Sequence, residues 1–275
     1  MLFASDLDQT LIYSPKAFRL LPNTSLSAIS SVEIYEGRDI SFMDDHAIMH
    51  LRKLAFHHCF VPVTTRTIEQ YQRIFLFHDE IMPTYGVVSN GANVIINGVV
   101  DQEWNKSVKG KIAQLCLCPQ DVLSQFSEIS HVSWAGPLKM ADSCFHYCIV
   151  ERDRVPMDAL VSFSAWAKAQ NWKVSLQGRK LYMVPEVVNK WDAVTYIRDL
   201  LKEKVVIAAG DSLLDLCMLE AANYAIAPCH GEIWESYCSG MLPDSSIQFT
   251  NQSGILAAQE ILNYVDQYTN YEMQA

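Results

Sequence analysis

Two carboxylates close together near the start of the chain are the first residues whose spacing suggests chemistry. Asp6 and Asp8 come directly after the apolar run 1–4, so both acids lie at the end of a predicted strand. In open α/β sheets, ligands bind at the carboxyl ends of the strands. Like charges held this close are costly unless a cation lies between them, and oxygen atoms are the ligands that Mg²⁺ prefers. The pair therefore predicts a magnesium site at one edge of a sheet.

Two further predicted strands, 60–63 and 205–209, also end in polar side chains. Strand 205–209 is a near-continuous apolar run, as strands buried on both faces are. Because the carboxyl ends of parallel strands meet at one edge of a sheet, we expect the polar residues that follow them to gather near Asp6. These residues are Thr64, Asp211, Asp215 and, at the start of a predicted helix, Lys190.

Each of these residues also has an ordinary structural interpretation when it is taken alone. An acid pair can be a solvated turn, and Thr64 can be a strand residue or a helix cap. Lys190 can be a solvated charge at a helix end, and Asp211 can be a turn residue that caps a helix. Their joint occurrence, in one order and at strand ends, is what favours a site that handles phosphate.

The same residues, in their order along the chain, resemble the four motifs of the haloacid dehalogenase superfamily of phosphatases. The motifs are D-x-D-x-T, a strand-terminal threonine, a lysine, and G-D-S-x-x-D. The resemblance covers nearly the whole chain, since its middle falls where one subfamily carries a large inserted α/β cap. Segments 89–92 (Ser-Asn-Gly-Ala) and 188–190 (Val-Asn-Lys) look most like the sugar-phosphatase branch, which includes sucrose-phosphate phosphatases.

The resemblance implies a role for each motif residue. Asp6 would attack phosphorus as the nucleophile, and Asp8 would act first as general acid and then as general base. Thr64 and Lys190 would hold phosphoryl oxygens. The implied cofactor is Mg²⁺, and its ligands would be the carboxylate of Asp6, the backbone carbonyl of Asp8, the carboxylate of Asp211 and, directly or by orienting the others, Asp215.

Two positions depart from the family pattern. Thr65 stands where glycine is usual, and Leu214 stands where asparagine is frequent. Neither change removes a charge that the mechanism requires. Leu214 does remove a polar side chain near the metal, so the surroundings of the metal are expected to differ from the family pattern.

The residues expected to contact the substrate lie in both parts of the chain. Arg179 lies beside a predicted turn at Gln177 and Gly178, so a solvated hairpin tip explains it equally well. The candidates are Thr65, Arg66, Asn90, Gly91 and Asn189 from the core, with Arg179 and Lys180 from the inserted region.

The order of the predicted elements indicates an α/β fold. Alternating strand-like and helix-like segments predict a Rossmann-like parallel-sheet core with three layers, α/β/α. The pattern changes to β-α-β-β between residues 106 and 184, which predicts an inserted α+β cap domain. The core would then comprise residues 1–105 and 185–275. The stretch 14–42, with a predicted hairpin at 32–42, is longer than the family connection needs, and we hypothesise that it forms a flap over the site.

The composition narrows the class of protein. At 275 residues and 50% hydrophobic content the chain can bury a substantial core, and extended disorder is not expected. A net charge of −10 argues against a nucleic-acid partner but not against an anionic small molecule in a locally positive pocket. With no basic segment before the first strand and no apolar run of about 20 residues, we expect no signal peptide, no membrane partner and a cytoplasmic location.

The sequence thus predicts a Mg²⁺-dependent phosphatase that acts on a small phosphorylated metabolite, with a sugar phosphate as the expected class. Three alternatives stay open: a phosphosugar mutase, a phosphate-accepting signalling protein, and a binding protein without turnover. Receiver domains place the phosphorylated aspartate and the acid pair on different strands, which argues against the second. The intact set of charges argues against the third. The leaving group and the oligomeric state are not defined by the sequence.

Overall fold

The computed structural model describes residues 1–20, 28–242 and 246–272, and the chain divides into two units. One comprises residues 1–100 and 190–275, and the other residues 101–189. The second unit therefore extends a few residues beyond the expected insert, 106–184, at each end. At the first boundary the reason is a helix, Gln102–Leu115, that begins before residue 106. Within the described residues, no helix is both long enough and apolar enough to cross a membrane.

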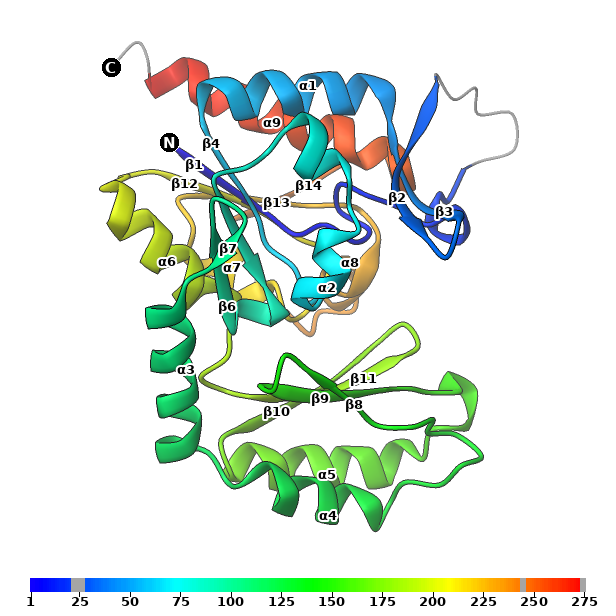
Figure 1. The fold of residues 1–275 in the computed structure, drawn as a ribbon. Coiled ribbons are helices and arrows are strands. Elements are labelled where there is room, and N and C mark those ends of the chain that lie inside the picture. The colour runs from blue at the N-terminus through cyan, green and yellow to red at the C-terminus, as the bar shows by residue number, and fades with distance from the viewer. Residues whose placement is uncertain (21–27, 243–245, 273–275) are drawn as a thin grey trace. The chain divides into compact units, whose positions relative to one another are not determined.

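A five-stranded parallel sheet forms the centre of the first unit (Figure 1). Its strands are β1 (Leu2–Ser5), β4 (Cys59–Pro62), β12 (Val206–Ala209), β13 (Tyr224–Ala227) and β14 (Ile247–Phe249), in the spatial order β14-β13-β12-β1-β4. The chain adds β4 on one side of β1 and the later strands on the other side. The strand order therefore reverses at β1, and ligands bind at the carboxyl edge beside such a switch point.

Helices cover both faces of this sheet, as the three-layer expectation requires. On one face α1 (Asp45–His57) packs along α9 (Ala257–Glu272), and on the other α6 (Lys190–Leu201) packs against α7 (Leu216–Ala221) (Figure 1). The buried positions of α1 repeat at helical spacing and face the core; they are Ala47, Ile48, Leu51 and Leu54. The remaining α-helices of this unit are α2 (Ile68–Gln72) and α8 (Gly231–Cys238). The expected α/β/α core is confirmed.

Two antiparallel ribbons accompany the parallel sheet. The hairpin of β2 (Ile29–Tyr35) and β3 (Arg38–Asp44) includes the expected hairpin 32–42, and residues 21–27 of the hypothesised flap lie outside the described residues. Phe42 and Tyr13 exchange two backbone hydrogen bonds of 2.8 Å, which attach the hairpin to the segment after β1. The second ribbon consists of β5 (Tyr85–Val88), β6 (Asn93–Ile96) and β7 (Val99–Val100).

Some local elements were not defined by the sequence analysis. Residues 68–80 contain α2 and a separate π-helical turn, Leu76–Glu80. The helix α3 (Gln102–Leu115) begins after Asp101, because the Asp101 side chain accepts hydrogen bonds from two backbone N–H groups there. The short elements α8 and β14 were not anticipated.

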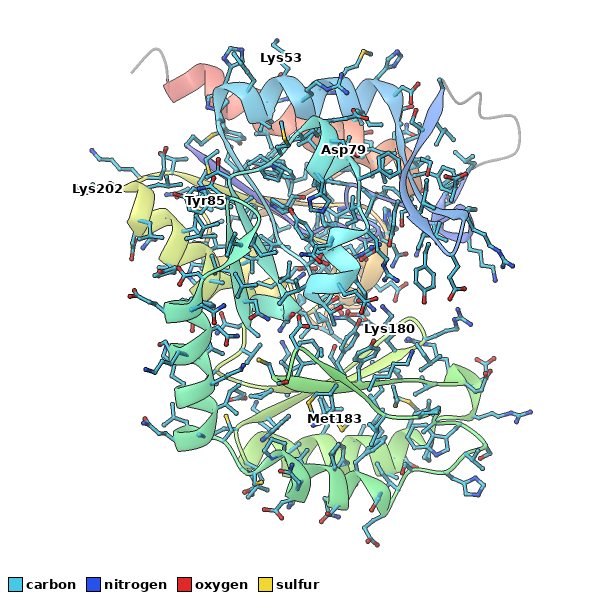
Figure 2. The ribbon with its side chains drawn as sticks, in the orientation of Figure 1. Lys53, Asp79, Tyr85, Lys180, Met183 and Lys202 are labelled. Atoms are coloured by element: carbon cyan, nitrogen blue, oxygen red, sulfur yellow. The ribbon has the colours of Figure 1, made fainter. Side chains whose placement is uncertain are left out.

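The second unit is an antiparallel sheet with helices on it. The sheet order is β10-β11-β9-β8, and the strands are β8 (Lys139–Ala141), β9 (Phe145–Ile149), β10 (Trp172–Gln177) and β11 (Lys180–Pro185). The unit's α-helices are α3, α4 (Pro119–Ser127) and α5 (Met157–Ala169), of which α4 and α5 pack together and α5 contacts β10. Its core includes Phe126, Phe163, Trp172 and Met183, and Met183 points from β11 toward α5 (Figure 2).

The aromatic core of the second unit leads to a prediction about stability. The ring of Phe126 lies 5.9 Å from that of Trp134 and 5.5 Å from that of Phe163, and Phe126 is 1% exposed. Phe126→Ala should lower the free energy of unfolding by about 3–5 kcal/mol, because it removes these contacts and leaves a cavity. Val132, which is 87% exposed, provides the control: Val132→Ala should change stability by less than about 0.5 kcal/mol. Urea denaturation followed by tryptophan fluorescence compares the two, and equal stabilities would contradict the prediction.

Candidate active site at the carboxyl edge of the core sheet

Three adjacent strands end at one edge of the core sheet, and candidate residues follow each of them. The register places Ser5 of β1 beside Ala209 of β12 and beside Pro62 of β4. The strands are parallel, so their next residues continue past the same edge. These residues include Asp6 after β1, Thr64 after β4 and Asp211 after β12.

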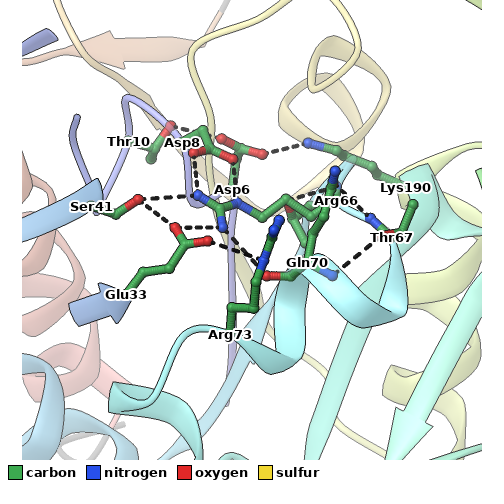
Figure 3. A network of polar contacts seen from close by, with 11 residues as sticks. Asp6, Asp8, Thr10, Glu33, Ser41, Arg66, Thr67, Gln70, Arg73 and Lys190 are labelled. Carbon is green, nitrogen blue, oxygen red and sulfur yellow. Dashed lines mark hydrogen bonds and ion pairs between the residues drawn. The ribbon is translucent and has the colours of Figure 1, made fainter. Parts of the chain in front are cut away.

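A buried lysine links two of the acids. The Lys190 ammonium, at the first residue of α6, donates a 2.6 Å hydrogen bond to Asp6 Oδ1 (Figure 3). It donates another to Asp215 Oδ1. The side chains of Lys190 and Asp215 are fully buried. Burial alone would lower the pKa of Lys190, but Asp215 and Asp6 raise it above its ordinary value, so the group is a cation. The site therefore has a built-in positive charge beside Asp6.

The acids outnumber this lysine. Asp6, Asp211 and Asp215 are buried, and each offers an oxygen within 4.8 Å of those of the other two. Burial and the neighbouring carboxylates raise the pKa of Asp6 to about 7 and that of Asp211 well above its ordinary value, although Lys190 acts in the opposite direction. If all three acids are ionised, the one ammonium leaves two negative charges uncompensated. These residues fit a divalent cation that prefers oxygen ligands, as Mg²⁺ does.

Asp215 differs from the other two acids in its partners. Its Oδ1 accepts from Lys190, and its Oδ2 accepts from the Ser212 N–H at 2.9 Å and from the Ser212 hydroxyl at 2.7 Å. Asp215 therefore orients the lysine and the loop after β12, and Asp6 and Asp211 would hold the metal directly. A Cβ atom at Gly210 would lie 2.5 Å from that of Asp215, so the close approach of this acid requires glycine.

A second glycine, Gly231 at the start of α8, packs against Asp211. Gly231 has a φ of +86°, and a Cβ atom there would lie 2.8 Å from the carbonyl oxygen of Asp211. Both the backbone conformation and the contact exclude a larger residue. Sequence reasoning missed Gly231, because nothing in the sequence connects α8 with the end of β12.

Threonine hydroxyls complete the surroundings of the nucleophile candidate. Thr10 Oγ1 donates to Asp6 Oδ2 at 3.3 Å. Thr64 is fully buried, and its Oγ1 accepts the Arg66 backbone N–H at 3.1 Å. A hydroxyl that accepts one hydrogen bond can still donate its own hydrogen. Thr64 is therefore suited to donate to a phosphoryl oxygen.

The turn Ser89–Gly91 is hydrogen-bonded to the segment that follows β4 at the carboxyl edge of the sheet. The Asn90 N–H donates to the Thr64 carbonyl at 2.9 Å, and the Ser89 N–H donates to the Arg66 carbonyl at 2.7 Å. All three turn residues have a positive φ, of 54°, 57° and 98°. Asparagine and glycine tolerate this conformation better than other residues do. The structure thus brings Asn90 and Gly91 to the same edge as Thr64 and Arg66.

Asp8 and Arg66 form a bidentate ion pair (Figure 3). Arg66 Nε donates to Asp8 Oδ2 and Nη2 donates to Asp8 Oδ1, both at 2.8 Å. Such a pair fixes the orientation of the carboxylate as well as its position. Arg66 was expected to contact substrate, and this partner was not foreseen. Glu33, which lies 2.8 Å from Arg66 Nη1, was also missed, although an acid within a predicted strand was a usable signal.

The other candidate residues have positions in the structure that do not indicate a role in the site. Thr65 is partly exposed beside Thr64, and Leu214 is buried, so no polar side chain stands at position 214. Arg179 follows Gly178 in the turn between β10 and β11, and it belongs to the second unit, as does Asn189. Substrate contacts from these two residues stay predictions.

Comparison with solved structures establishes the fold. The chain is similar to the sucrose-phosphatase of Synechocystis sp. PCC6803 in complex with sucrose and phosphate, at 15% identity over 97% of this chain and 98% of that one, with a TM-score of 0.67. It is similar to the sugar phosphatase BT4131 of haloacid dehalogenase subclass IIB (11% identity, 98% of each chain, TM-score 0.57). It is also similar to the IMP-nucleotidase of Plasmodium falciparum (12% identity, 97% of this chain and 68% of that one, TM-score 0.54).

These likenesses show a shared fold, that of haloacid dehalogenase-type phosphatases, with a parallel-sheet core and an inserted α+β unit. A comparison with protein-family models and one with curated proteins each give no match.

The charge balance predicts that Mg²⁺ stabilises the protein through Asp211. At a Mg²⁺ concentration of 100 times Kd, the free energy of unfolding should rise by about 2.7 kcal/mol, seen as a higher thermal midpoint. Asp211→Asn should lose this rise and, in EDTA, should be at least as stable as the native protein, because one repelling charge is gone. The control is Asp199→Asn, whose side chain is 64% exposed, and it should respond as the native protein does. An undiminished Mg²⁺ effect in Asp211→Asn would contradict the assignment.

Proposed function

We propose that this protein is a Mg²⁺-dependent phosphomonoesterase that acts on a small phosphorylated metabolite through an aspartyl-phosphate. The observation that carries the proposal is that Asp6, at a strand end, accepts a 2.6 Å hydrogen bond from the Lys190 ammonium and has an oxygen within 4.8 Å of one of Asp211. The fold supports it, since similar solved structures bear the names of phosphatases and a nucleotidase. Two of these structures are named sucrose-phosphatase and sugar phosphatase, so we infer that the substrate is a sugar phosphate.

The first step is attack by Asp6 on phosphorus. A phosphate monoester is a dianion and repels a carboxylate unless positive charge intervenes. Lys190 supplies one such charge, and a Mg²⁺ ion held by Asp6 and Asp211 would offset charge on the nucleophile and on the phosphoryl oxygens. The bond between an Asp6 oxygen and phosphorus forms while the bond to the leaving oxygen breaks. The Thr64 hydroxyl would donate its hydrogen to a phosphoryl oxygen, since its oxygen accepts the Arg66 N–H.

Asp8 moves the protons of both steps. As a carboxylic acid it gives its proton to the leaving oxygen, and as a carboxylate it then takes a proton from the water that hydrolyses the aspartyl-phosphate. The products are the dephosphorylated metabolite and inorganic phosphate, and Asp6 is restored. The Asp8 side chain is 50% exposed, which allows it to contact both a leaving group and water.

The second unit is the part that we propose selects the leaving group. Its turn residue Arg179 offers a positive charge, and Asn189 precedes the catalytic Lys190. We propose that Thr65, Asn90 and Gly91 supply the substrate contacts of the core. Arg66 contacts Asp8 in this structure, so we propose that Arg66 holds the proton carrier Asp8 and does not bind the leaving group.

The proposed function predicts phosphate release that depends on both the metal and Asp6. The native protein with Mg²⁺ should release inorganic phosphate from 4-nitrophenyl phosphate, and EDTA should abolish the release. Asp6→Asn should lower kcat by at least about 10³-fold, because the covalent route is lost. The exposed-site variant Asp199→Asn is the matched control and should keep native activity. Equal activity of Asp6→Asn and native protein would remove Asp6 as nucleophile, and isomerisation of a sugar phosphate without release would indicate a mutase.

A further inference from the structure

A fully buried glutamate lies in the hairpin of β2 and β3. Glu33 is 0% exposed, whereas the next residues, Ile34 and Tyr35, are 50% and 42% exposed. The pairing of the two strands shifts register on both sides of Glu33. Irregularities of this kind redirect side chains and are common near active sites. Val32 and Glu33 are both buried although they are consecutive, so the irregularity turns this carboxylate inward.

The partners of Glu33 explain how a carboxylate can be buried there (Figure 3). Its Oε2 lies 2.8 Å from Arg66 Nη1 and accepts the Ser41 hydroxyl at 2.5 Å. Its Oε1 lies 3.6 Å from Arg73 Nε, and the Arg73 guanidinium lies 4.3 Å from the centre of the Tyr35 ring. A buried charge is tolerated when it is paired and hydrogen-bonded. The hairpin therefore holds a fixed negative charge against two arginines of the segment after β4.

Arg66 connects this buried charge with the proton carrier. Its Nη1 faces Glu33, and its Nε and Nη2 each donate to one oxygen of Asp8 at 2.8 Å. A guanidinium is planar and rigid, so fixing one nitrogen constrains the directions of the other two. Asp8 itself is half exposed, and two side-chain bonds of an aspartate can rotate. Glu33 does not touch Asp8, but it holds the guanidinium that holds Asp8.

We propose that Glu33, in the hairpin of β2 and β3, is a positioning residue that aligns the general acid Asp8 by way of Arg66. This inference rests on the proposed phosphatase function. It assigns to Glu33 a role that is distinct from the charge cluster around Lys190. Ser41 assists, since its hydroxyl contacts Glu33 and lies 3.3 Å from Arg66 Nη2.

A misaligned general acid has a specific kinetic signature. The 4-nitrophenolate ion is a stable leaving group that needs little protonation, whereas the alkoxide of a sugar phosphate needs a proton as it departs. The quantity kcat/KM covers the steps up to departure of the leaving group and not the later hydrolysis, which is common to both substrates. Glu33→Gln should therefore lower kcat/KM for glucose 6-phosphate by about 10-fold more than for 4-nitrophenyl phosphate, within the range of about 10²–10⁴ that general acids contribute.

The matched control is a glutamate at the tip of the same hairpin. Glu36 is exposed, and Glu36→Gln should keep the native ratio of the two kcat/KM values. Thermal unfolding of each variant shows whether it is folded. If Glu33→Gln does not fold, Arg66→Lys and Ser41→Ala decide the matter, since both disturb the same contacts, and the expected loss is again larger for glucose 6-phosphate.

The outcomes separate this inference from the function on which it rests. A folded Glu33→Gln with the native ratio, or with equal losses for both substrates, would show that Glu33 only stabilises the fold and would overturn the inference while the phosphatase function stands. A native protein that releases phosphate from neither substrate contradicts the proposed function, and the inference falls with it. A selective loss with glucose 6-phosphate supports both.

Discussion

The site depends on the neutralisation of acids that the fold buries together. Because β1 and β12 are adjacent and parallel, Asp6 and Asp211 leave the same edge of the sheet, and Asp215 lies directly before α7. Lys190 supplies one positive charge to this cluster and is itself fully buried. Burial and the neighbouring carboxylates raise the pKa of Asp6 and of Asp211, and they make the cluster complementary to a divalent cation. Under the proposed function, that cation and Lys190 would supply the positive charge that attracts a phosphate group.

Two aspartates only two positions apart are placed in opposite surroundings. Asp6 is 5% exposed and is held by Lys190 and Thr10, all inside the core. The Asp8 side chain is 50% exposed and is held from the hairpin side by Arg66. A nucleophile benefits from a fixed, dry environment, whereas a group that exchanges protons must reach substrate and water. The backbone at the end of β1 places Asp6 inside the core and Asp8 toward solvent. The hairpin residue Glu33 contacts the arginine that holds Asp8.

The part of the site that could be predicted from sequence is the part that regular secondary structure determines. Apolar strands that stop at polar residues place Asp6, Thr64 and Asp211 at one edge in any parallel sheet, and the α/β/α layers followed from the alternation of elements. The ion pair of Asp8 with Arg66 was not predictable in this way, since it joins side chains 58 residues apart in the chain. The inward turn of Glu33 was not predictable either, since it depends on an irregularity in the pairing of β2 and β3. The contact of α8 with the end of β12 likewise depends on tertiary packing. The second unit, which we propose selects the leaving group, offered less to predict from sequence, because no strand end fixes where its side chains lie.

The most direct measurement of the central claim is the detection of a phosphoryl group on Asp6. The variant Asp8→Asn, which lacks the base for hydrolysis, is mixed with 4-nitrophenyl phosphate and Mg²⁺ and quenched in acid. Its peptides are then analysed by mass spectrometry, with Asp6→Asn as the control. The account predicts one phosphoryl group on the peptide at Asp6 in the first variant and none in the control. Release of 4-nitrophenol without any phosphorylation of Asp6 would contradict it.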